Sequence, residues 1–471
     1  MKILLISANR EMLPDPVAPI GLAYVAAAIK KAGHSVSMLD LCFSDAIESA
    51  IKDEIKIYNP EVIGISIRNI DNVSYPNSIS YIAAIKDVVD TCKGSSNAKI
   101  VLGGSGFTIM PEKLLEFFNV DIGIIGEGEE TFPELLEKIR GENSYETIPG
   151  IVFRTRLTGR QEGNRIIKNP IRIIKDLNCL SIPDRALLDN TRYLKDGGSG
   201  SIQTKRGCYF KCIYCTYPLV EGTEVRLRPP KLAADEFELL EKEYNLSHVF
   251  IVDNVFNYPI SHAEEICREL IKRGLKIKWS CYANPGFITE RLVDLMVKAG
   301  CTGIDLGTDV ASEKMLKNMG KNFNLSVLKE ASRICNNAGL SVCQSLLLGG
   351  PGETEDTVKE TLENIEALKP KAVVAMTGIR MYPNTTLAKI AEEECMIQES
   401  ELSLKPYFYI SSGVKENLVD IVEEFSSRLS HWILPGKNIR MTEKIQRMLR
   451  KYGAIGPLWE SVRGIDKTAR R

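Results

Sequence analysis

Charge of one sign, long apolar runs and histidine are all in short supply in this 471-residue sequence. Its 60 Lys and Arg residues and 61 Asp and Glu residues leave a formal net charge of −1. Such a balance provides no global field that would attract nucleic acid or an anionic membrane. No apolar stretch reaches the roughly 18–20 residues that a membrane-spanning helix needs, so we expect no transmembrane segment.

The sequence also begins without the features of a secretory signal peptide, because its short apolar run leads directly into a helical pattern. Twelve cysteines in a large chain of this kind indicate a reducing compartment and thiols that are not paired as disulfides. We therefore expect a cytoplasmic protein that has no nucleic-acid partner.

What the sequence does contain is a long alternation of strand and helix patterns, and its length predicts two or three domains. In residues 1–140, apolar and β-branched runs predict buried parallel strands. These runs are Lys2–Ser7, His34–Asp40, Val62–Ile67, Lys99–Leu102 and Asp121–Ile125. With helical patterns between them, they predict an α/β domain with a doubly wound, flavodoxin-like sheet. Ligands of such sheets bind at the carboxyl ends of the strands.

Residues 141–195 are irregular, and we interpret them as a linker with one weak hairpin, Ile151–Arg154 against Arg165–Lys168. A second alternation occupies residues 196–394, and its six strand patterns suit a partial (β/α)6 barrel. These patterns are Ser201–Lys205, Val249–Asp253, Lys276–Tyr282, Gly303–Gly307, Ser341–Leu348 and Lys371–Ile379. Residues 395–471 are predicted to form a helical C-terminal region. Its ten basic residues from Lys437 onward are interpreted as a solvated helical face.

Three cysteines stand directly after the first strand of this barrel, in the segment RGCYFKCIYCTY. Cys208, Cys212 and Cys215 have the spacing C-x3-C-x2-C, and so tight a loop can supply thiolates to three irons of a [4Fe–4S] cluster. The fourth iron would then be open to a small-molecule ligand. The alternative is a zinc site, which needs a fourth protein ligand such as Cys179 or Cys281.

Here the sequence resembles the radical S-adenosylmethionine (SAM) superfamily. The segments that carry the resemblance are the cysteine loop, LGGPGET (Leu348–Thr354) and MYPNTTL (Met381–Leu387). The resemblance implies that SAM chelates the open iron and that Tyr214 packs near its adenine. It also implies SAM contacts from Asp253 and Asn254, which end the second strand. Asp309 stands where relatives commonly have the Glu of a Gly-x-Glu-Ser stretch, so its expected SAM contact departs from the family pattern.

Small-residue loops follow three strands of the first sheet, and their glycines let the backbone approach a ligand closely. They are Arg68–Tyr75, GGSGFT (Gly103–Thr108) and GEGEET (Gly126–Thr131). With PIGLAYVAAAIKKAGHSVSMLDL and PEVIGIS, they resemble the cobalamin-binding domain that precedes the radical SAM barrel in one large subclass. The resemblance implies cobalamin contacts from Ser66, Arg68, Gly103, Gly104, Gly126 and Glu127. The alternative is a flavodoxin-like scaffold that binds nothing or recognises substrate.

Many cobalamin domains carry the string D-x-H-x-x-G, whose histidine ligates cobalt from below, and this string is absent. His34 precedes the second strand, on the edge of the sheet away from the ligand loops. We therefore expect cobalamin without a histidine ligand, and we place Arg68 nearest the lower face of the cobalt. A guanidinium stays protonated and cannot ligate. Alternatively, Arg68 forms an ion pair with Asp71 or contacts a cobalamin side-chain amide.

The resemblance implies an enzyme with three cofactors: a [4Fe–4S] cluster, SAM and cobalamin. We predict a methyltransferase that moves a methyl group from SAM through methylcobalamin to an unactivated carbon, or a phosphinate phosphorus, of a small molecule or lipid. The alternative is a cobalamin-associated radical SAM cyclase or ring-rearranging enzyme that does not methylate. A sensor protein is disfavoured by the intact cysteine triad. An electron donor such as flavodoxin or ferredoxin is the expected protein partner.

Overall fold

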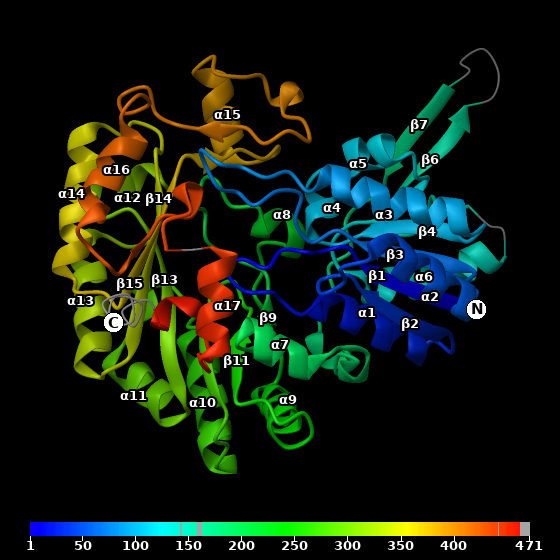
Figure 1. Ribbon diagram of the computed structural model, residues 1–471, viewed down its shortest axis with the longest axis horizontal. Coiled ribbons are helices and arrows are strands. Elements are labelled where there is room, and N and C mark those ends of the chain that lie inside the picture. Colours follow the sequence, from blue (N-terminus) through cyan, green and yellow to red (C-terminus); the bar gives the residue numbers. More distant parts are fainter. Residues whose placement is uncertain (142–143, 158–162, 441, 462–471) are drawn as a thin grey trace.

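The structure, a computed structural model, describes residues 1–141, 144–157, 163–440 and 442–461. It consists of two α/β halves that lie side by side, the amino-terminal half in blue and cyan and the barrel half in green and yellow (Figure 1). Each half is built on a seven-stranded sheet. Within the described residues, every helix is too short or too polar to cross a bilayer.

The first sheet has the strand order β2-β1-β3-β4-β5-β6-β7, and its first five strands in this order run parallel. Residues 3–6 of β1 are fully buried because helices cover both faces of the sheet. This arrangement confirms the predicted doubly wound sheet. The parallel strands are β1 (Lys2–Ser7), β2 (Ser35–Asp40), β3 (Val62–Ser66), β4 (Lys99–Gly103) and β5 (Ile122–Ile124). The helices are α1 (Ile20–Lys31), α2 (Ile47–Tyr58), α3 (Ile82–Ser95), α4 (Ser105–Ile109), α5 (Pro111–Phe118) and α6 (Gly128–Arg140).

The segment interpreted as a linker contributes two strands to this sheet. Strand β6 (Ile151–Leu157) pairs antiparallel with β5, and β7 (Gly163–Lys168) pairs with β6. Without β6, the backbone groups of β5 would be left unpaired at an edge, and the buried side chains of residues 151–153 complete the core there. The segment then continues through the short turns η1 (Leu177–Cys179) and η2 (Arg185–Leu187) to helix α7 (Asn190–Gly197).

The second sheet is parallel throughout, in the order β18-β15-β14-β13-β12-β11-β8. Its first six strands in chain order are the predicted barrel strands: β8 (Gly200–Ile202), β11 (His248–Ile251), β12 (Lys278–Ala283), β13 (Cys301–Asp309), β14 (Ser341–Leu348) and β15 (Ala372–Thr377). The covering helices are α9 (Pro230–Lys242), α10 (Ile260–Arg273), α11 (Glu290–Lys298), α12 (Glu313–Asn318), α13 (Leu325–Asn337) and α14 (Glu355–Ala367). The partial barrel is thus confirmed.

The C-terminal region is helical, as predicted, but it also completes the barrel. It contains α15 (Thr386–Glu393), α16 (Leu418–Ser427) and α17 (Glu443–Lys451), and it supplies the seventh strand, β18 (Trp432–Ile433). The turn η6 (Leu458–Ser461) then brings Trp459 against residues of β14, β15 and β18. Its basic face is not wholly solvated, since Arg450 is buried and lies 2.5 Å from Asp15 of the first half.

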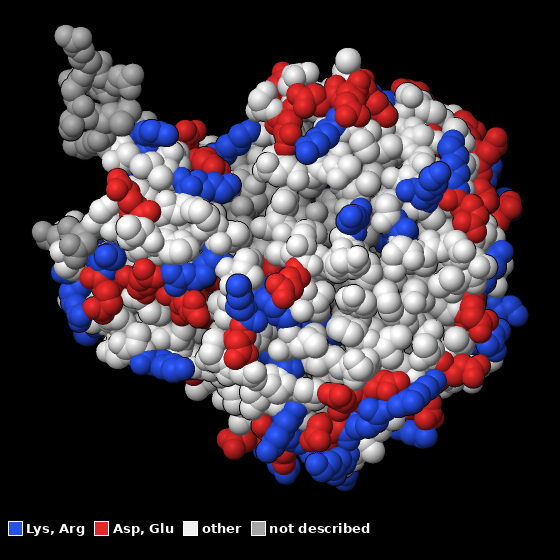
Figure 2. Space-filling view, turned by 180° about the vertical axis from the view of Figure 1, so that it is seen from behind, with Lys and Arg blue, Asp and Glu red and all other residues white. Residues whose placement is uncertain are grey.

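The two halves meet through the carboxyl ends of their strands. Helix α4, after β4, packs against α8 (Tyr217–Glu221), which follows the cysteine loop. Asp71, after β3, forms a 2.9 Å ion pair with Arg380, after β15. Figure 2 shows the halves from behind, with a notch between them at the upper edge and charges of both signs over the surface. The predicted ligand loops of both sheets therefore face a shared space.

Candidate functional site

The cysteine loop starts after the short strand β9 (Lys205–Arg206) and is held by its own backbone. The Cys208 amide donates to Gly222 O at 3.1 Å, and the Cys215 amide donates to Cys212 O at 3.2 Å. Gly207 has φ +89°, and a Cβ there would lie 2.0 Å from Glu224 O. Glycine is therefore required where the loop leaves the strand.

Burial raises the pKa of all three thiols of this loop, and the pKa of Cys215 reaches about 12. The thiols also raise one another's pKa, because they lie close enough to interact electrostatically. Positive charge is therefore needed to hold them as thiolates, which are the form that binds iron. This donor set fits a [4Fe–4S] cluster, in which each of three irons takes one cysteine.

The zinc alternative lacks support in the described part of the chain. Cys281 lies in the core between the sheet and its helices, and Cys179 is exposed in the connecting segment. No three His, Cys, Asp or Glu residues among those described are grouped closely enough to hold a single ion. A fourth protein ligand, which zinc requires, is therefore not supplied by either cysteine that could have provided it.

Asp309 brings two elements of the site together at the end of β13, where it has φ +63°. Its Oδ2 accepts a hydrogen bond from the Tyr214 hydroxyl at 2.6 Å and one from Lys321 Nζ at 2.8 Å. The same Nζ lies 3.8 Å from Cys212 Sγ. Although burial alone would lower the pKa of Lys321, Asp309 and Cys212 raise it, so the cation is retained. A carboxylate ligand such as that of SAM would find this ammonium beside the cysteine loop.

The sequence analysis did not identify Lys321 as a site residue. It also did not predict the hydrogen bond between Tyr214 and Asp309. Lys321 follows α12, in a polar loop with no motif of its own. The only available signal was its position one short helix after the end of a barrel strand, where the ligand ends of such barrels lie.

Replacing Asp309 with alanine is expected to weaken SAM binding about tenfold or more, because it frees the Lys321 ammonium and the Tyr214 hydroxyl that together shape the pocket. The cluster should remain, since Asp309 is not one of the thiolates. Equilibrium dialysis of SAM and the iron–sulfur absorbance measure the two effects. Asp309→Asn is the matched control, because its amide oxygen still accepts from Tyr214, and an unchanged SAM affinity in both variants would contradict the assignment.

Asp253 is 1% exposed, and its acceptors are occupied by its neighbours. It takes hydrogen bonds from the Thr204 amide at 2.6 Å, from the Thr204 hydroxyl and from the Lys205 amide at 3.2 Å. Burial raises the pKa of this carboxyl, and Lys205 opposes the rise. Asp253 thus ties the end of β8 to β11 and supports the cysteine loop, instead of presenting its carboxylate to SAM as expected.

Asn254 lies beside the cysteine loop and donates from Nδ2 to Glu221 Oε2 at 2.8 Å, while its buried Oδ1 has no partner among the described residues. Glu221, which sequence reasoning missed, also accepts from the Gly207 amide at 3.1 Å. The amide oxygen of Asn254 could therefore accept a hydrogen bond from a cofactor at this end of the barrel.

On the first sheet, Ser66 and Gly103 end adjacent strands, and Arg68 follows two residues after Ser66, at the carboxyl end of the sheet. The Arg68 side chain is exposed and has no hydrogen bond to any described residue. Its charge opposes the burial that raises the pKa of Tyr217 and Tyr282 in the barrel half and of Glu11 and Cys42 in its own half. The alternative ion pair with Asp71 is wrong, because Asp71 pairs with Arg380.

The predicted absence of a histidine at the ligand edge agrees with the position of His34, whose Nδ1 lies 3.4 Å from the Met1 amino group at the opposite edge. The glycines of the ligand loops also have structural roles. Gly104 has φ +98°, and a Cβ there would lie 2.5 Å from Ile67 O. Gly126 has φ +72° and would press on Ile171. These loops therefore need glycine for the fold as well as for a ligand.

Glu127 was expected at the cofactor, but its carboxylate is buried in the contact between the halves. It lies 2.7 Å from Arg226 and 3.7 Å from Arg206, and it accepts from the Ile174 amide at 2.7 Å. Neighbouring Glu129 also pairs with Arg206, at 2.5 Å. Since Arg206 stands two residues before Cys208, these ion pairs connect the GEGEE loop directly to the cysteine loop.

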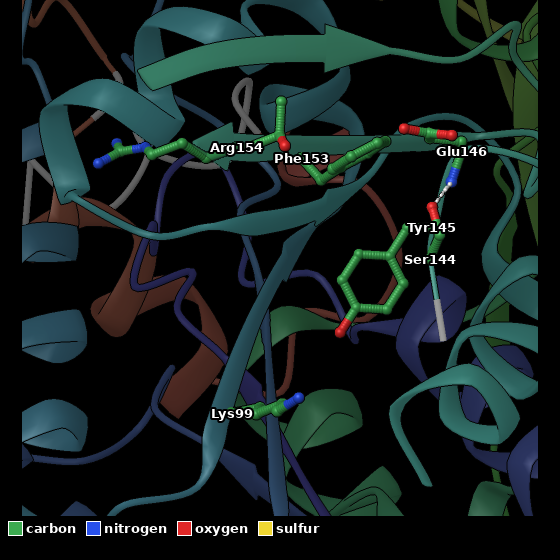
Figure 3. Close-up of a pocket in the computed structure, with 7 residues that line it drawn as sticks. Lys99, Ser144, Tyr145, Glu146, Phe153 and Arg154 are labelled. Atoms are coloured by element: carbon green, nitrogen blue, oxygen red, sulfur yellow. Dashed lines mark hydrogen bonds between the residues drawn. The ribbon is translucent and has the colours of Figure 1, made fainter. Parts of the chain in front are cut away.

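A separate hollow of about 420 Å³ lies at the other edge of the first sheet, lined by Lys99, Tyr145, Phe153 and neighbouring residues (Figure 3). Lys99 begins β4 there, so the hollow lies at the amino-terminal ends of the parallel strands. Ligands of doubly wound sheets bind at the opposite ends. This hollow is therefore not part of the candidate site.

Two family models match the chain. Residues 8–136 match the B12 binding domain, and residues 202–365 match the Radical SAM superfamily. The two matches coincide with the two halves whose ligand edges face each other, and the second includes all three loop cysteines.

The chain is similar to named relatives over most of its length. The chain is 25% identical to the tryptophan 2-C-methyltransferase of Streptomyces laurentii, over 82% of this chain and 74% of that one. It is 27% identical to the anaerobic magnesium-protoporphyrin IX monomethyl ester cyclase of Cereibacter sphaeroides, over 73% of this chain and 55% of that one. The fold matches the structure of the radical SAM methyltransferase TsrM from Kitasatospora setae, solved with tryptophan and a SAM analogue bound. The TM-score is 0.87 at 23% identity, covering 100% of this chain and 98% of that one. The chain therefore carries a B12-binding domain followed by a radical SAM domain.

Proposed function

We propose that this enzyme is a cobalamin-dependent radical SAM methyltransferase that transfers a methyl group from SAM to an unactivated carbon of a small molecule. The observation that carries the proposal is the meeting of two ligand edges. The cysteine loop and the β3 and β4 loops of the B12-binding domain open onto one space, joined through α4 and α8. A substrate in that space would lie between the two cofactor positions. The methyltransferases among the relatives support the same reaction class.

Each group of residues has a distinct task in this proposal. Cys208, Cys212 and Cys215 hold the cluster, while Lys321 and Asp309 orient the carboxylate and ammonium of SAM. When bound, the cluster supplies the electron that cleaves SAM, and cobalamin supplies a carrier for the methyl group. Arg68 would contribute to the cobalamin site a charged group that cannot ligate a metal. The buried ion pairs between the halves fix the distance between the two sites and exclude water.

We further propose that the enzyme works in the cytoplasm and receives electrons from a small donor such as flavodoxin or ferredoxin. The loop residue Tyr209 supports a donor site, because its side chain is 63% exposed beside Cys208. Here the cysteine loop reaches the surface, where a donor could approach it.

Product analysis tests methylation against the cyclase alternative that the Cereibacter relative represents. Anaerobic incubation of the reconstituted enzyme with SAM, reductant and candidate small molecules should give methylated product together with S-adenosylhomocysteine and 5′-deoxyadenosine in equal amounts. Mass spectrometry measures all three. Deoxyadenosine without any methylated product would favour the cyclase or rearrangement reaction, and enzyme without substrate is the control for uncoupled SAM cleavage.

A further inference from the structure

The interior of the barrel is closed at its base by the C-terminal segment. Trp459 packs there with Cys343, Ala372 and Ile433. The room for its indole comes from Gly303, where a Cβ would lie 2.6 Å from the Trp459 ring. Because this floor fills the barrel below the level of Asp305, a substrate chain cannot pass through the barrel.

Asp305 stands on this floor and faces the barrel interior, because its β13 neighbours Ile304 and Leu306 face the helices. Its Oδ2 accepts a hydrogen bond from Trp459 Nε1 at 3.1 Å, and the neighbouring Cys343 thiol opposes the rise of its pKa. A carboxylate has about four acceptor positions, so the bond from Trp459 leaves capacity for a ligand.

No described Lys or Arg forms an ion pair with Asp305, in contrast to two other acids of the site. Asp309 has Lys321 at 2.8 Å, and Glu127 has Arg226 at 2.7 Å. Asp305 is 8% exposed, and burial raises its pKa to about 7. A buried carboxylate without a cation is costly, and a bound ammonium would offset that cost.

The walls above Asp305 are aromatic. Phe250 and Tyr282 face each other across neighbouring strands with ring centroids 4.9 Å apart. Tyr282 is 44% exposed, yet burial raises the pKa of its hydroxyl, with a further contribution from Asp305. Tyr217 of α8 combines 45% exposure with a pKa raised to about 12. Tyr282 is the register partner of Asp305 on the neighbouring strand, so its accessible ring stands beside the carboxylate.

We propose that Asp305 binds the protonated amine of a small, ring-bearing substrate whose ring lies against Tyr282 and Phe250. The inference rests on the proposed function for the identity of the space as the substrate site, and it adds the substrate class. Trp459 is a positioning residue, since the hydrogen bond from its indole N–H fixes the orientation of the Asp305 carboxylate. Aromatic walls also favour a cation at this position, because ring faces attract ammonium groups.

Binding of two isosteric probes to the cluster- and cobalamin-loaded enzyme tests the proposal. Benzylamine and benzyl alcohol share a ring and differ in the ammonium. The chain has three tryptophans, so labelling with 5-fluorotryptophan gives three ¹⁹F signals, and Trp459→Phe identifies the one from the floor. Benzylamine should shift the Trp459 signal saturably and bind at least about tenfold more tightly than the alcohol. Equal affinities, or no shift with either probe, would overturn the proposal.

Asp305→Asn should reduce benzylamine binding to the level of benzyl alcohol, because the amide still accepts from Trp459 but carries no charge. Asp294→Asn is the matched control, since it removes a carboxylate that is exposed and pairs with Lys298 on the surface. If Asp305 serves only to anchor Trp459, Asp305→Asn will move the Trp459 signal but leave benzylamine binding unchanged, which also overturns the proposal. The probe comparison in the unmodified enzyme needs no variant to fold. The binding measurement also does not depend on methyl transfer. An enzyme that binds benzylamine preferentially but never methylates a substrate would therefore contradict the proposed function and leave the Asp305 proposal intact.

Discussion

Replacing Cys208, Cys212 or Cys215 with alanine is expected to remove the iron–sulfur absorbance near ~400 nm and to abolish SAM cleavage. Each thiolate would hold one iron, and the loop itself contains no fourth cysteine that could replace a lost ligand. Lys321 cannot compensate, since an ammonium has no lone pair for iron. Anaerobic reconstitution followed by absorbance, iron counting and deoxyadenosine analysis measures the loss.

The controls for this experiment are cysteines buried elsewhere in the chain. Cys92 lies in the core of the first sheet and Cys335 in the core of the barrel, and burial raises the pKa of both to about 12. Alanine at either position should leave the cluster intact. A variant that lacks all three loop cysteines and still produces 5′-deoxyadenosine would refute the cluster assignment.

Replacing Glu127 with alanine is expected to lower the free energy of unfolding by about 3–5 kcal/mol, the usual cost of removing one partner of a buried ion pair. The change leaves Arg226 buried without its carboxylate and removes the acceptor of the Ile174 amide. Since the pair joins the two halves, cobalamin and cluster retention should both become more sensitive to denaturant. Urea unfolding followed by circular dichroism and by the absorbance of both cofactors measures these effects.

Two other substitutions separate this structural role from the cofactor role expected of Glu127. Glu127→Gln keeps the acceptor for Ile174 and should lose less stability than Glu127→Ala. Glu130→Ala removes an exposed acid of the same loop, 3.7 Å from Arg172, and should cost at most about 1 kcal/mol. If Glu127→Ala lost cobalamin affinity while unfolding at the same denaturant concentration as the parent enzyme, a direct cofactor contact would be the better explanation.

Much of the fold follows from local patterns. Strands such as Lys2–Ser7 and Ser341–Leu348 are predictable because the first sheet is covered by helices on both faces and the second curves around the barrel interior, so the strands are apolar along most of their length. The cysteine loop was predictable for a related reason, since its three ligands lie within eight residues of one another. The hairpin of Ile151–Arg154 with Arg165–Lys168 was predicted. Its pairing with β5 was not, because the sequence of an edge strand does not indicate which strand will pair with it.

Side-chain partnerships within the site were less predictable. Glu127 and Asp253 have the residue type and strand-end position of cofactor ligands, but a carboxylate pairs with whichever donor the fold brings nearest. For Glu127 that donor is Arg226, 99 positions along the chain, and for Asp253 it is Thr204, 49 positions back. Trp459 reaches Asp305 across 154 positions.

The sequence by itself thus determined the two α/β halves, the cysteine triad and the family, since each depends on hydrophobic periodicity or on residues close together in the chain. Only the tertiary structure decided that Glu127 joins the halves, that Lys321 lies beside Cys212, and that Trp459 closes the barrel below Asp305. Hydrophobic burial acts on every residue of an element and leaves a repeating pattern. A hydrogen bond or ion pair depends on two atoms a few ångströms apart, and their positions are established only when the whole chain has folded.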